Sequence, residues 1–457
     1  MAASLYVPPF ERNQREAMTT TRMHESLAER CDLSLASARY RYRLPRATSK
    51  GHTSRVPGLI SLLFQRERRG HLSTPERLAT NESFLPFGIN SQFHEVDQLV
   101  ERLYCGEFSA DGRQFLIAGQ SEEISVYDSA TWKRVLSLPA RNLRWTVTDA
   151  HFTPNADSIV YSSITSSVRL VSPTSETTFR LSPSRQSTPS TRYLRDFGVW
   201  CLGLNSSGTE LLAGTSSNSV VLHDMTTNKT VCHLMGHTND VNAITFVDDY
   251  SNVFLSGSDD QLIKLWDRRM MSESNATPQG VFPGHTDGVT HLSSRNDGYY
   301  FISNAKDQSC KLWDLRKCLS NDKVQVVPRR YEWDYRFEMY PGYEDDEAET
   351  PHPQDQSIMT YRGHMVQQTL IRCYFSPLHS TAQRFIYSGS ADGDVYIYDV
   401  LTGAIVEQLE RNQSPRDRRR GPPGVTRDVR WHPHLPMLVS PDFDGKLCVW
   451  QKDPPAH

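Results

Sequence analysis

GHTNDVNAITFVDDYSNVFLSGSDDQLIKLWDRR, residues 236–269, is the stretch of this sequence that decides its fold. It recurs as GHTDGVTHLSSRNDGYYFISNAKDQSCKLWDLR at residues 284–316, so that Trp266 and Trp313 lie 47 residues apart. In each copy, short apolar runs alternate with turns rich in Asp, Gly, Ser and Asn, which is the pattern of successive antiparallel strands. The repeat predicts an array of similar β-units that bury their apolar faces against one another.

Weaker copies extend the repeat in both directions, at residues 108–128, 152–171 and 204–224 before it and at 363–399 and 425–450 after it. The run from Gly-His to Trp-Asp resembles the blade of a WD40 propeller. This resemblance, and not the composition, implies seven units. We therefore predict an all-β fold, a seven-bladed WD40 β-propeller that spans residues 84–451.

Four positions keep a fixed spacing inside the clearest units. Counted back from the Trp or Tyr, an Asp lies six residues earlier and a Ser ten residues earlier, and a His opens the unit. In WD40 blades, which these units resemble, such residues form a buried hydrogen-bond network, because buried polar groups must be paired. The predicted network residues are His237, Ser256, Asp260 and Trp266; His285, Ser303, Asp307 and Trp313; and His364, Ser388, Asp392 and Tyr398.

The same residue types form Ser-His-Asp catalytic triads, so an enzyme is the competing interpretation. A triad occurs once in a chain and needs an oxyanion hole, whereas this set recurs at the same offsets. Repetition favours the structural role. The sequence also has no phosphate-binding loop and no metal-ligand spacing, and we expect no catalytic residues, no cofactor and no metal.

The ring of blades must also close. After Trp450 only seven residues remain, and two of them are proline, which cannot donate to a strand ladder. We therefore expect the last blade to take its outer strand from residues 84–103.

Two segments depart from the repeat. His364 lies 51 positions after Trp313, whereas His285 lies only 19 positions after Trp266, which predicts an inserted loop at about 319–360. Its aromatic part suggests an ordered clamp on the propeller or a partner, and its acidic run at 344–349 suggests disorder. WDYR at 333–336 imitates a blade ending, but no blade pattern precedes it.

The other departure is a basic N-terminal extension, residues 1–83, expected to be largely disordered with a short helix near 58–69. A C-terminal tail covers 452–457. Residues 1–80 hold 14 Lys and Arg against 7 Asp and Glu, although the whole chain has a net charge of −3. No basic cluster is interleaved with aromatics, so direct nucleic-acid binding ranks lowest among the possible functions.

Location follows from similar observations. No apolar run approaches the roughly 20 residues that a membrane-spanning helix needs, and the first residues do not resemble a secretory signal. The eight cysteines form no CxxC pair, which favours reduced core thiols over zinc ribbons or disulfides. We expect a protein of the nucleus and cytoplasm without a membrane partner.

Both strong units end in Trp-Asp-x-Arg, as WDRR at 266–269 and WDLR at 313–316. The arginines should lie on adjacent blades, at the face remote from the buried networks, where paired guanidinium groups suit recognition of carboxylates or carbonyls. The pattern resembles the WDxR box of substrate receptors for cullin-4 RING ubiquitin ligases. By this resemblance the adaptor-docking candidates are Asp267, Arg269, Asp314 and Arg316, with Leu62, Leu63 and Phe64 of the N-terminal helix.

The resemblance implies a non-catalytic substrate receptor. It would dock on a propeller adaptor of the damaged-DNA-binding-protein type, reach cullin-4 and a RING subunit through that adaptor, and recruit protein substrates for ubiquitination and proteasomal degradation. The alternative is a WD40 scaffold in an unrelated nuclear assembly, such as one for RNA processing or chromatin, in which the arginines form only local ion pairs.

Overall fold

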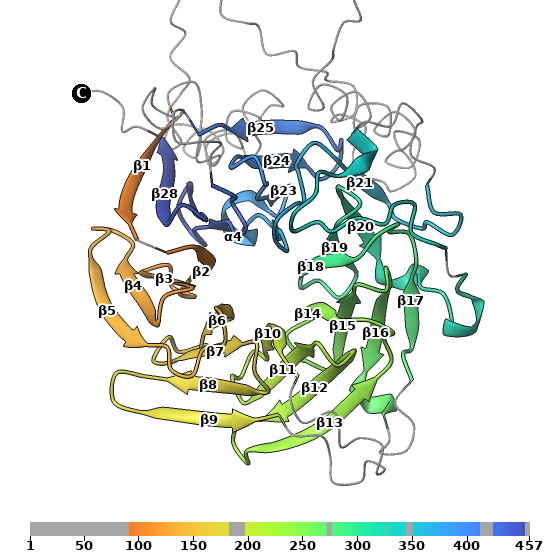
Figure 1. Ribbon diagram of the computed structural model, residues 1–457, viewed down its shortest axis with the longest axis horizontal. Helices are drawn as coiled ribbons and strands as arrows, with labels where there is room; N and C mark the ends of the chain where they lie inside the picture. The colour runs from red at the N-terminus through yellow and green to blue at the C-terminus, as the bar shows by residue number, and fades with distance from the viewer. Residues whose placement is uncertain are drawn as a thin grey trace, which may run out of the picture.

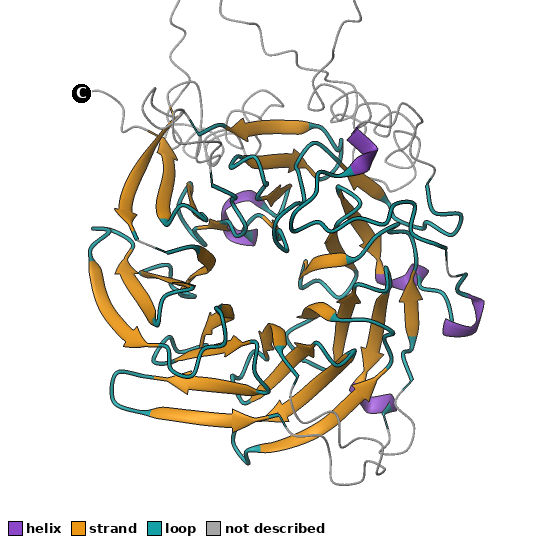
Figure 2. Ribbon diagram, in the orientation of Figure 1, coloured by secondary structure: helices purple, strands orange, loops and turns teal. Residues whose placement is uncertain are grey.

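Seven four-stranded antiparallel sheets form a ring in the computed structural model (Figure 1). The structure describes residues 91–99, 101–181, 197–271, 277–325, 327–343, 351–411 and 424–452. Strands make up nearly all of the regular structure in these ranges, and the few helices are short turns in the connections (Figure 2). The seven-bladed propeller predicted from the repeat is confirmed.

Six blades consist of consecutive strands, with the first strand innermost. Blade 1 contains β2 Leu103–Phe108, β3 Gln114–Gly119, β4 Glu123–Asp128 and β5 Arg134–Pro139. Blade 2 contains β6 Val147–Phe152, β7 Ile159–Ser163, β8 Ser167–Val171 and β9 Glu176–Arg180. Blade 3 contains β10 Val199–Leu204, β11 Glu210–Thr215, β12 Ser219–Asp224 and β13 Lys229–Met235.

The next three blades follow the same order. Blade 4 contains β14 Val241–Phe246, β15 Val253–Ser258, β16 Ile263–Asp267 and β17 Gly280–Phe282. Blade 5 contains β18 Val289–Ser294, β19 Tyr300–Ala305, β20 Ser309–Asp314 and β21 Met359–Tyr361. Blade 6 contains β22 Cys373–Phe375, β23 Phe385–Ser388, β24 Val395–Asp399 and β25 Ile405–Leu409.

Blade 7 joins the two ends of the propeller. Its strands are β26 Arg430–Trp431, β27 Met437–Pro441, β28 Lys446–Lys452 and the outermost strand β1 Ser91–Gln98. β1 pairs with β28 in antiparallel register, with a bulge between Glu95 and Asp97. The expectation that the outer strand comes from residues 84–103 is confirmed. This pairing closes the ring, so that no blade in the described residues lacks its fourth strand.

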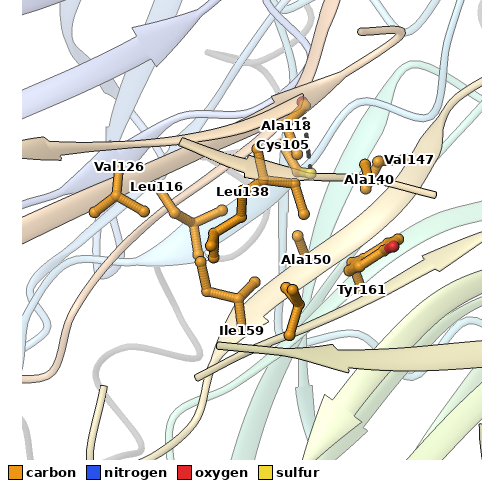
Figure 3. Close-up of a cluster of buried hydrophobic side chains, with 12 residues drawn as sticks. Cys105, Leu116, Ala118, Val126, Leu138, Ala140, Val147, Ala150, Ile159 and Tyr161 are labelled. Atoms are coloured by element: carbon orange, nitrogen blue, oxygen red, sulfur yellow. Dashed lines mark hydrogen bonds between the residues drawn. The ribbon is translucent and has the colours of Figure 1, made fainter. Parts of the chain in front are cut away.

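The hydrophobic core lies within and between the blades. Figure 3 shows one cluster, in which Leu116, Val126 and Leu138 of blade 1 pack near Ala150, Ile159 and Tyr161 of blade 2. Each blade thus buries a face that it could not bury alone, which explains why the apolar alternation persists through blades whose Trp-Asp signature is weak.

The ring has two faces, and residues on one face cannot contact a partner bound to the other. The upper face carries the connections between blades and the turns between second and third strands, such as 259–262. The lower face carries the turns between first and second strands, such as 247–252, and those that follow third strands, such as Arg268–Met270. Within the described ranges, no helix has the length and apolar character needed to span a membrane.

Candidate functional site

The buried networks of blades 4 and 5 have the expected hydrogen bonds. In blade 4, Trp266 Nε1 donates a hydrogen bond of 2.8 Å to Ser256 Oγ. Ser256 Oγ lies 2.7 Å from His237 Nε2, and His237 Nδ1 lies 2.8 Å from Asp260 Oδ2. In blade 5, the same chain runs from Trp313 through Ser303 and His285 to Asp307, at 2.7, 2.6 and 2.8 Å.

These networks are structural. Ser256 and Ser303 are fully buried, and each hydroxyl is held between an indole and an imidazole. Burial alone would raise the pKa of Asp260, but the hydrogen bond and the charge of His237 have the larger opposite effect, so the pKa of Asp260 is lowered. Each network ties an upper-face connection to the adjoining strands.

The network predicted for blade 6 is wrong in part. His364 Nδ1 lies 2.9 Å from Tyr398 Oη, and its Nε2 lies 2.8 Å from Asn304 Oδ1 of blade 5. Ser388 instead donates to the carbonyl oxygen of Gly389, and Asp392 accepts from Tyr396 Oη. The cause is the Tyr398 phenol, which reaches the imidazole directly and takes the place that Asp holds in the Trp-containing blades.

The two WDxR arginines lie at the lower face, opposite the networks. In blade 4, β16 runs from Ile263, next to the Asp260 turn, to Asp267 at the other end, and Arg269 follows in a 3-10 turn at Arg268–Met270. Arg316 follows β20 in the matching turn at Leu315–Lys317 of blade 5. The two blades are neighbours, since β14 and β15 pack against β18.

Each arginine forms a bidentate ion pair with the aspartate of its own motif. Arg269 donates from Nε and Nη2 to Asp267 at 2.9 and 2.6 Å, and Arg316 donates likewise to Asp314 at 2.8 Å from both atoms. Hydrogen bonds from Arg269 lower the pKa of Asp267. The local ion pair is therefore present, yet the arginine side chains stay 64% and 61% exposed. The pairing uses Nε and Nη2 of each guanidinium, so Nη1 keeps its donors free of hydrogen bonds to other described residues.

Exposed apolar side chains surround these arginines. Tyr250 in the 247–252 turn is 84% exposed, Met270 beside Arg269 is 65% exposed, and Tyr299 is 51% exposed. Tyr299 lies under the Arg316 guanidinium at 5.1 Å, and Ser294 Oγ donates to the Val247 carbonyl at 2.8 Å, which joins the two blades next to these turns. We call Tyr250, Arg269, Met270, Tyr299 and Arg316 the lower-face patch.

Sequence reasoning found the arginines but missed the three apolar members of the patch. Tyr250 and Tyr299 occupy equivalent turns, each just before the second strand of its blade. That shared position is the signal that could have identified them.

Residues 327–343 of the inserted loop pack on the upper face. Trp333 Nε1 donates to Asp287 at 2.9 Å, Tyr343 Oη donates to Gln308 at 2.8 Å, and Lys306 Nζ lies 4.0 Å from the Tyr335 ring centre. The expected packing of its aromatic part on the propeller is confirmed for residues 327–343. WDYR pairs Asp334 with Arg336 as the other two motifs do, but it lies at the opposite face from the lower-face patch.

A cavity of about 450 Å³ occupies the central channel. Part of its charged lining forms ion pairs: Arg372 of blade 6 reaches Asp149 of blade 2 at 2.8 Å and Asp428 of blade 7 at 3.2 Å. Burial lowers the pKa of His151, but Asp149 and Glu107 outweigh it and raise the pKa to about 10. These ion pairs join blades across the channel. The remaining docking candidates Leu62, Leu63 and Phe64, and the helix expected near 58–69, lie outside the described residues.

The fold and its Trp-Ser-His-Asp networks define a WD40-repeat β-propeller. The family model for the WD domain, G-beta repeat, matches residues 228–267, 276–314 and 355–399, which are the segments around the networks of blades 4, 5 and 6.

Comparison with known proteins shows to which family of WD40-repeat proteins this chain belongs. The chain is 38% identical over 390 residues to the LEC14B homolog of Prunus armeniaca, covering 84% of this chain and 78% of that protein. It is 30% identical over 467 residues to the DDB1- and CUL4-associated factor 11 homolog of Caenorhabditis elegans, covering 98% of this chain and 78% of that protein. The chain belongs to the WD40-repeat family that contains the LEC14B proteins and the DDB1- and CUL4-associated factor 11 homologs.

Proposed function

We propose that this chain is a non-catalytic substrate receptor of a cullin-4 RING ubiquitin ligase, and that its lower-face patch docks on the DDB1-type propeller adaptor. Family membership supports the proposal, because two relatives are named as DDB1- and CUL4-associated factors. The observation that carries it is the patch itself: two exposed arginines on adjacent blades, among exposed apolar side chains of the same two blades.

The chemistry of the patch suits a protein partner. Arg and Tyr are enriched among the residues that contribute most to protein–protein binding, especially where apolar contacts exclude water around them. The aspartate of each motif holds its guanidinium in place before binding, so little side-chain entropy is lost when the remaining donors meet carboxylates or carbonyls.

The test is a quantitative pull-down of purified DDB1 adaptor by the full chain and by Arg269→Ala/Arg316→Ala. We expect adaptor affinity to fall by about 100-fold or more, because two desolvated bidentate arginines are lost. The melting temperature should be nearly unchanged, because both side chains are exposed and remote from the core.

Arg336→Ala is the matched control, since it removes the third arginine of the same local pattern from the upper face. Full adaptor recovery by a folded double variant would contradict the docking role and favour the alternative, a WD40 scaffold in another nuclear assembly. An equal loss for Arg336→Ala would also contradict the assignment of the lower face.

A further inference from the structure

The connection from blade 1 to blade 2, residues 140–146, presents a strained tryptophan at the upper face. Trp145 has φ 74°, a left-handed backbone conformation that costs a bulky residue free energy. Its side chain is nevertheless 61% exposed. Burial of the indole therefore does not offset the strain.

Trp132 provides a direct comparison. It also has a positive φ, of 54°, but its ring packs against Phe108 and Phe115 with centroid distances of 6.5 and 6.1 Å. Packing accounts for Trp132 but not for Trp145, whose conformation must be held by the rest of its connection.

Hydrogen bonds hold that connection. The backbone N–H groups of Arg141 and Arg144 donate to Tyr161 Oη and Ser163 Oγ, both at 2.9 Å. Ser163 Oγ in turn donates to the Thr146 carbonyl at 2.9 Å. The connection is thus fixed to blade 2, and the indole is presented in a preorganised position.

Trp145 stands at one end of an aromatic row. Its ring centre lies 5.8 Å from that of Tyr104, which lies 4.8 Å from that of Phe443. Trp145 lies in the connection that leads into blade 2, Tyr104 in blade 1 and Phe443 in blade 7, and the inner strands β6, β2 and β26 of these blades are neighbours in the ring. The row therefore crosses three blades at the upper face.

Two exposed arginines lie close to this row. The Arg102 guanidinium lies 5.3 Å from the Phe443 ring centre, and the exposed Arg144 precedes Trp145. Arg102 also interacts with the Tyr104 phenol. Among the described residues, neither arginine forms an ion pair with a carboxylate, although Glu101 adjoins Arg102 and Asp444 adjoins Phe443 in the sequence. We call the exposed Trp145, Arg102 and Arg144, together with the partly buried Phe443 and the buried Tyr104 that they contact or adjoin, the Trp145 patch.

We propose that the Trp145 patch binds an acidic peptide segment of a protein partner, with an apolar side chain of the peptide on the indole and its carboxylates on Arg102 and Arg144. Charge complementarity identifies the occupant, because exposed guanidinium groups without carboxylate partners suit bidentate carboxylate recognition. RNA is a poorer fit, since residues 81–457 carry 36 Lys and Arg against 46 Asp and Glu and only one indole is exposed here.

Given the proposed function, the position of the patch suits it to substrate capture. Trp145 lies on the upper face, whereas Arg269 and Arg316 lie on the lower face. An adaptor bound to the lower face leaves the Trp145 patch free to capture a protein for ubiquitination. Peptide binding itself needs no adaptor and can be tested without one.

The experiment is a selection from an mRNA-display library of random twelve-residue peptides on the immobilised full chain, followed by fluorescence anisotropy with the most enriched peptide. We expect enriched sequences that combine Asp or Glu with an aromatic or large aliphatic residue. Arg102→Glu/Arg144→Glu should weaken binding by about 30-fold or more, the scale of a binding hot spot. The control Lys133→Glu/Arg180→Glu makes the same charge change at exposed residues outside the patch and should leave affinity unchanged.

Trp145→Gly separates binding from folding. Glycine adopts a positive φ without strain, so the melting temperature should be equal or higher while peptide affinity falls by at least tenfold. Selected peptides that lack acidic residues, or that bind both patch variants as well as the wild type, would overturn the proposal. Displacement of the peptide by an equimolar U12 oligonucleotide would overturn the choice of a peptide over RNA. Adaptor pull-down by the same variants should be normal, which distinguishes failure here from failure of the lower-face assignment.

Discussion

Whether an arginine near a Trp-Asp pair can bind a partner depends on the ion pairs that it already forms within the propeller. Arg268 and Arg269 are adjacent in sequence, yet Arg268 donates to both carboxylate oxygens of Glu210 at 2.6 and 2.8 Å and links blade 4 to blade 3. Arg269 pairs only with Asp267 and remains mostly exposed. One residue of the pair therefore stabilises the ring, and its neighbour is available to a partner.

His364 offers a test of the buried networks at the scale of one residue. Burial lowers the pKa of His364 from 6.5 to about 4 in the folded protein, so the unfolded chain binds more protons between these two values. The contribution of the neutral ring is fully present above about pH 6.5 and is lost as the pH falls through 4. The loss should approach about 3 kcal/mol.

The measurement is the free energy of unfolding by urea at pH 7, 6, 5 and 4, for wild type and for His364→Gln. The wild type should lose more stability than the variant over this range, because only the wild type carries the buried imidazole. The exposed His379 provides the control substitution His379→Gln, which should follow the wild-type curve. Parallel curves for wild type and His364→Gln would show that the network tolerates a charged ring.

At the scale of elements, the inserted loop is anchored by a few side chains. Trp333 bonds to Asp287 and packs on Tyr340 at a centroid distance of 5.2 Å. Trp333→Ala should weaken the attachment of this segment by about 2 kcal/mol, because it removes aromatic packing and leaves the buried Asp287 with one donor fewer. Hydrogen exchange of amides 331–343 should then be about 30-fold faster.

The strands of the ring should keep their exchange rates in the Trp333 variant, since they pair with one another and not with residues 331–343. Phe337→Ala is the matched control, because Phe337 belongs to the same segment but is 84% exposed. Unchanged exchange at 331–343 in Trp333→Ala would mean that other contacts suffice to anchor the segment.

The sequence predicted elements well wherever a local pattern determines structure. The spacing of His285, Ser303, Asp307 and Trp313 predicted a network, because the strand register alone brings those positions together. The same spacing did not predict the network around Tyr398. That network depends on how far the phenol reaches and on Asn304 of the neighbouring blade 5, and both depend on tertiary packing. The face reached by Arg336 could not be predicted either, since it depends on how the insertion folds back. Trp145 gave no sequence signal, because a positive φ at a tryptophan follows from the bonds of its whole connection.

For the whole molecule, ring closure is the feature that most affects integrity. β1 pairs along its length with β28, and it lies at the start of the described residues, so a nine-residue difference in truncation decides whether it is present. Removal of residues 1–90 should leave a cooperative thermal transition. Removal of residues 1–99 should expose the edge of β28 and cause aggregation or a much lower melting temperature.

The measurement is light scattering together with a melting curve for both truncations at equal concentration. If the longer truncation melts with the same cooperativity as the shorter one, β1 is dispensable and the remaining three strands of blade 7 close the ring unaided.

The pairing of β1 with β28 also has a consequence for synthesis in the cell. β1 leaves the ribosome early, but its partner strand is about 350 residues further along; Glu95 and Lys446, which form an ion pair in the finished ring, are separated by 351 positions. At a translation rate of about 5–20 residues per second, roughly 20–70 seconds pass between the synthesis of β1 and that of β28. During this time the backbone groups of β1 lack the hydrogen bonds that β28 later supplies. During that interval the nascent chain is an open arc with a strand at one end that can pair with a second nascent chain. Polysome density and chaperone supply therefore bear directly on the yield of closed rings.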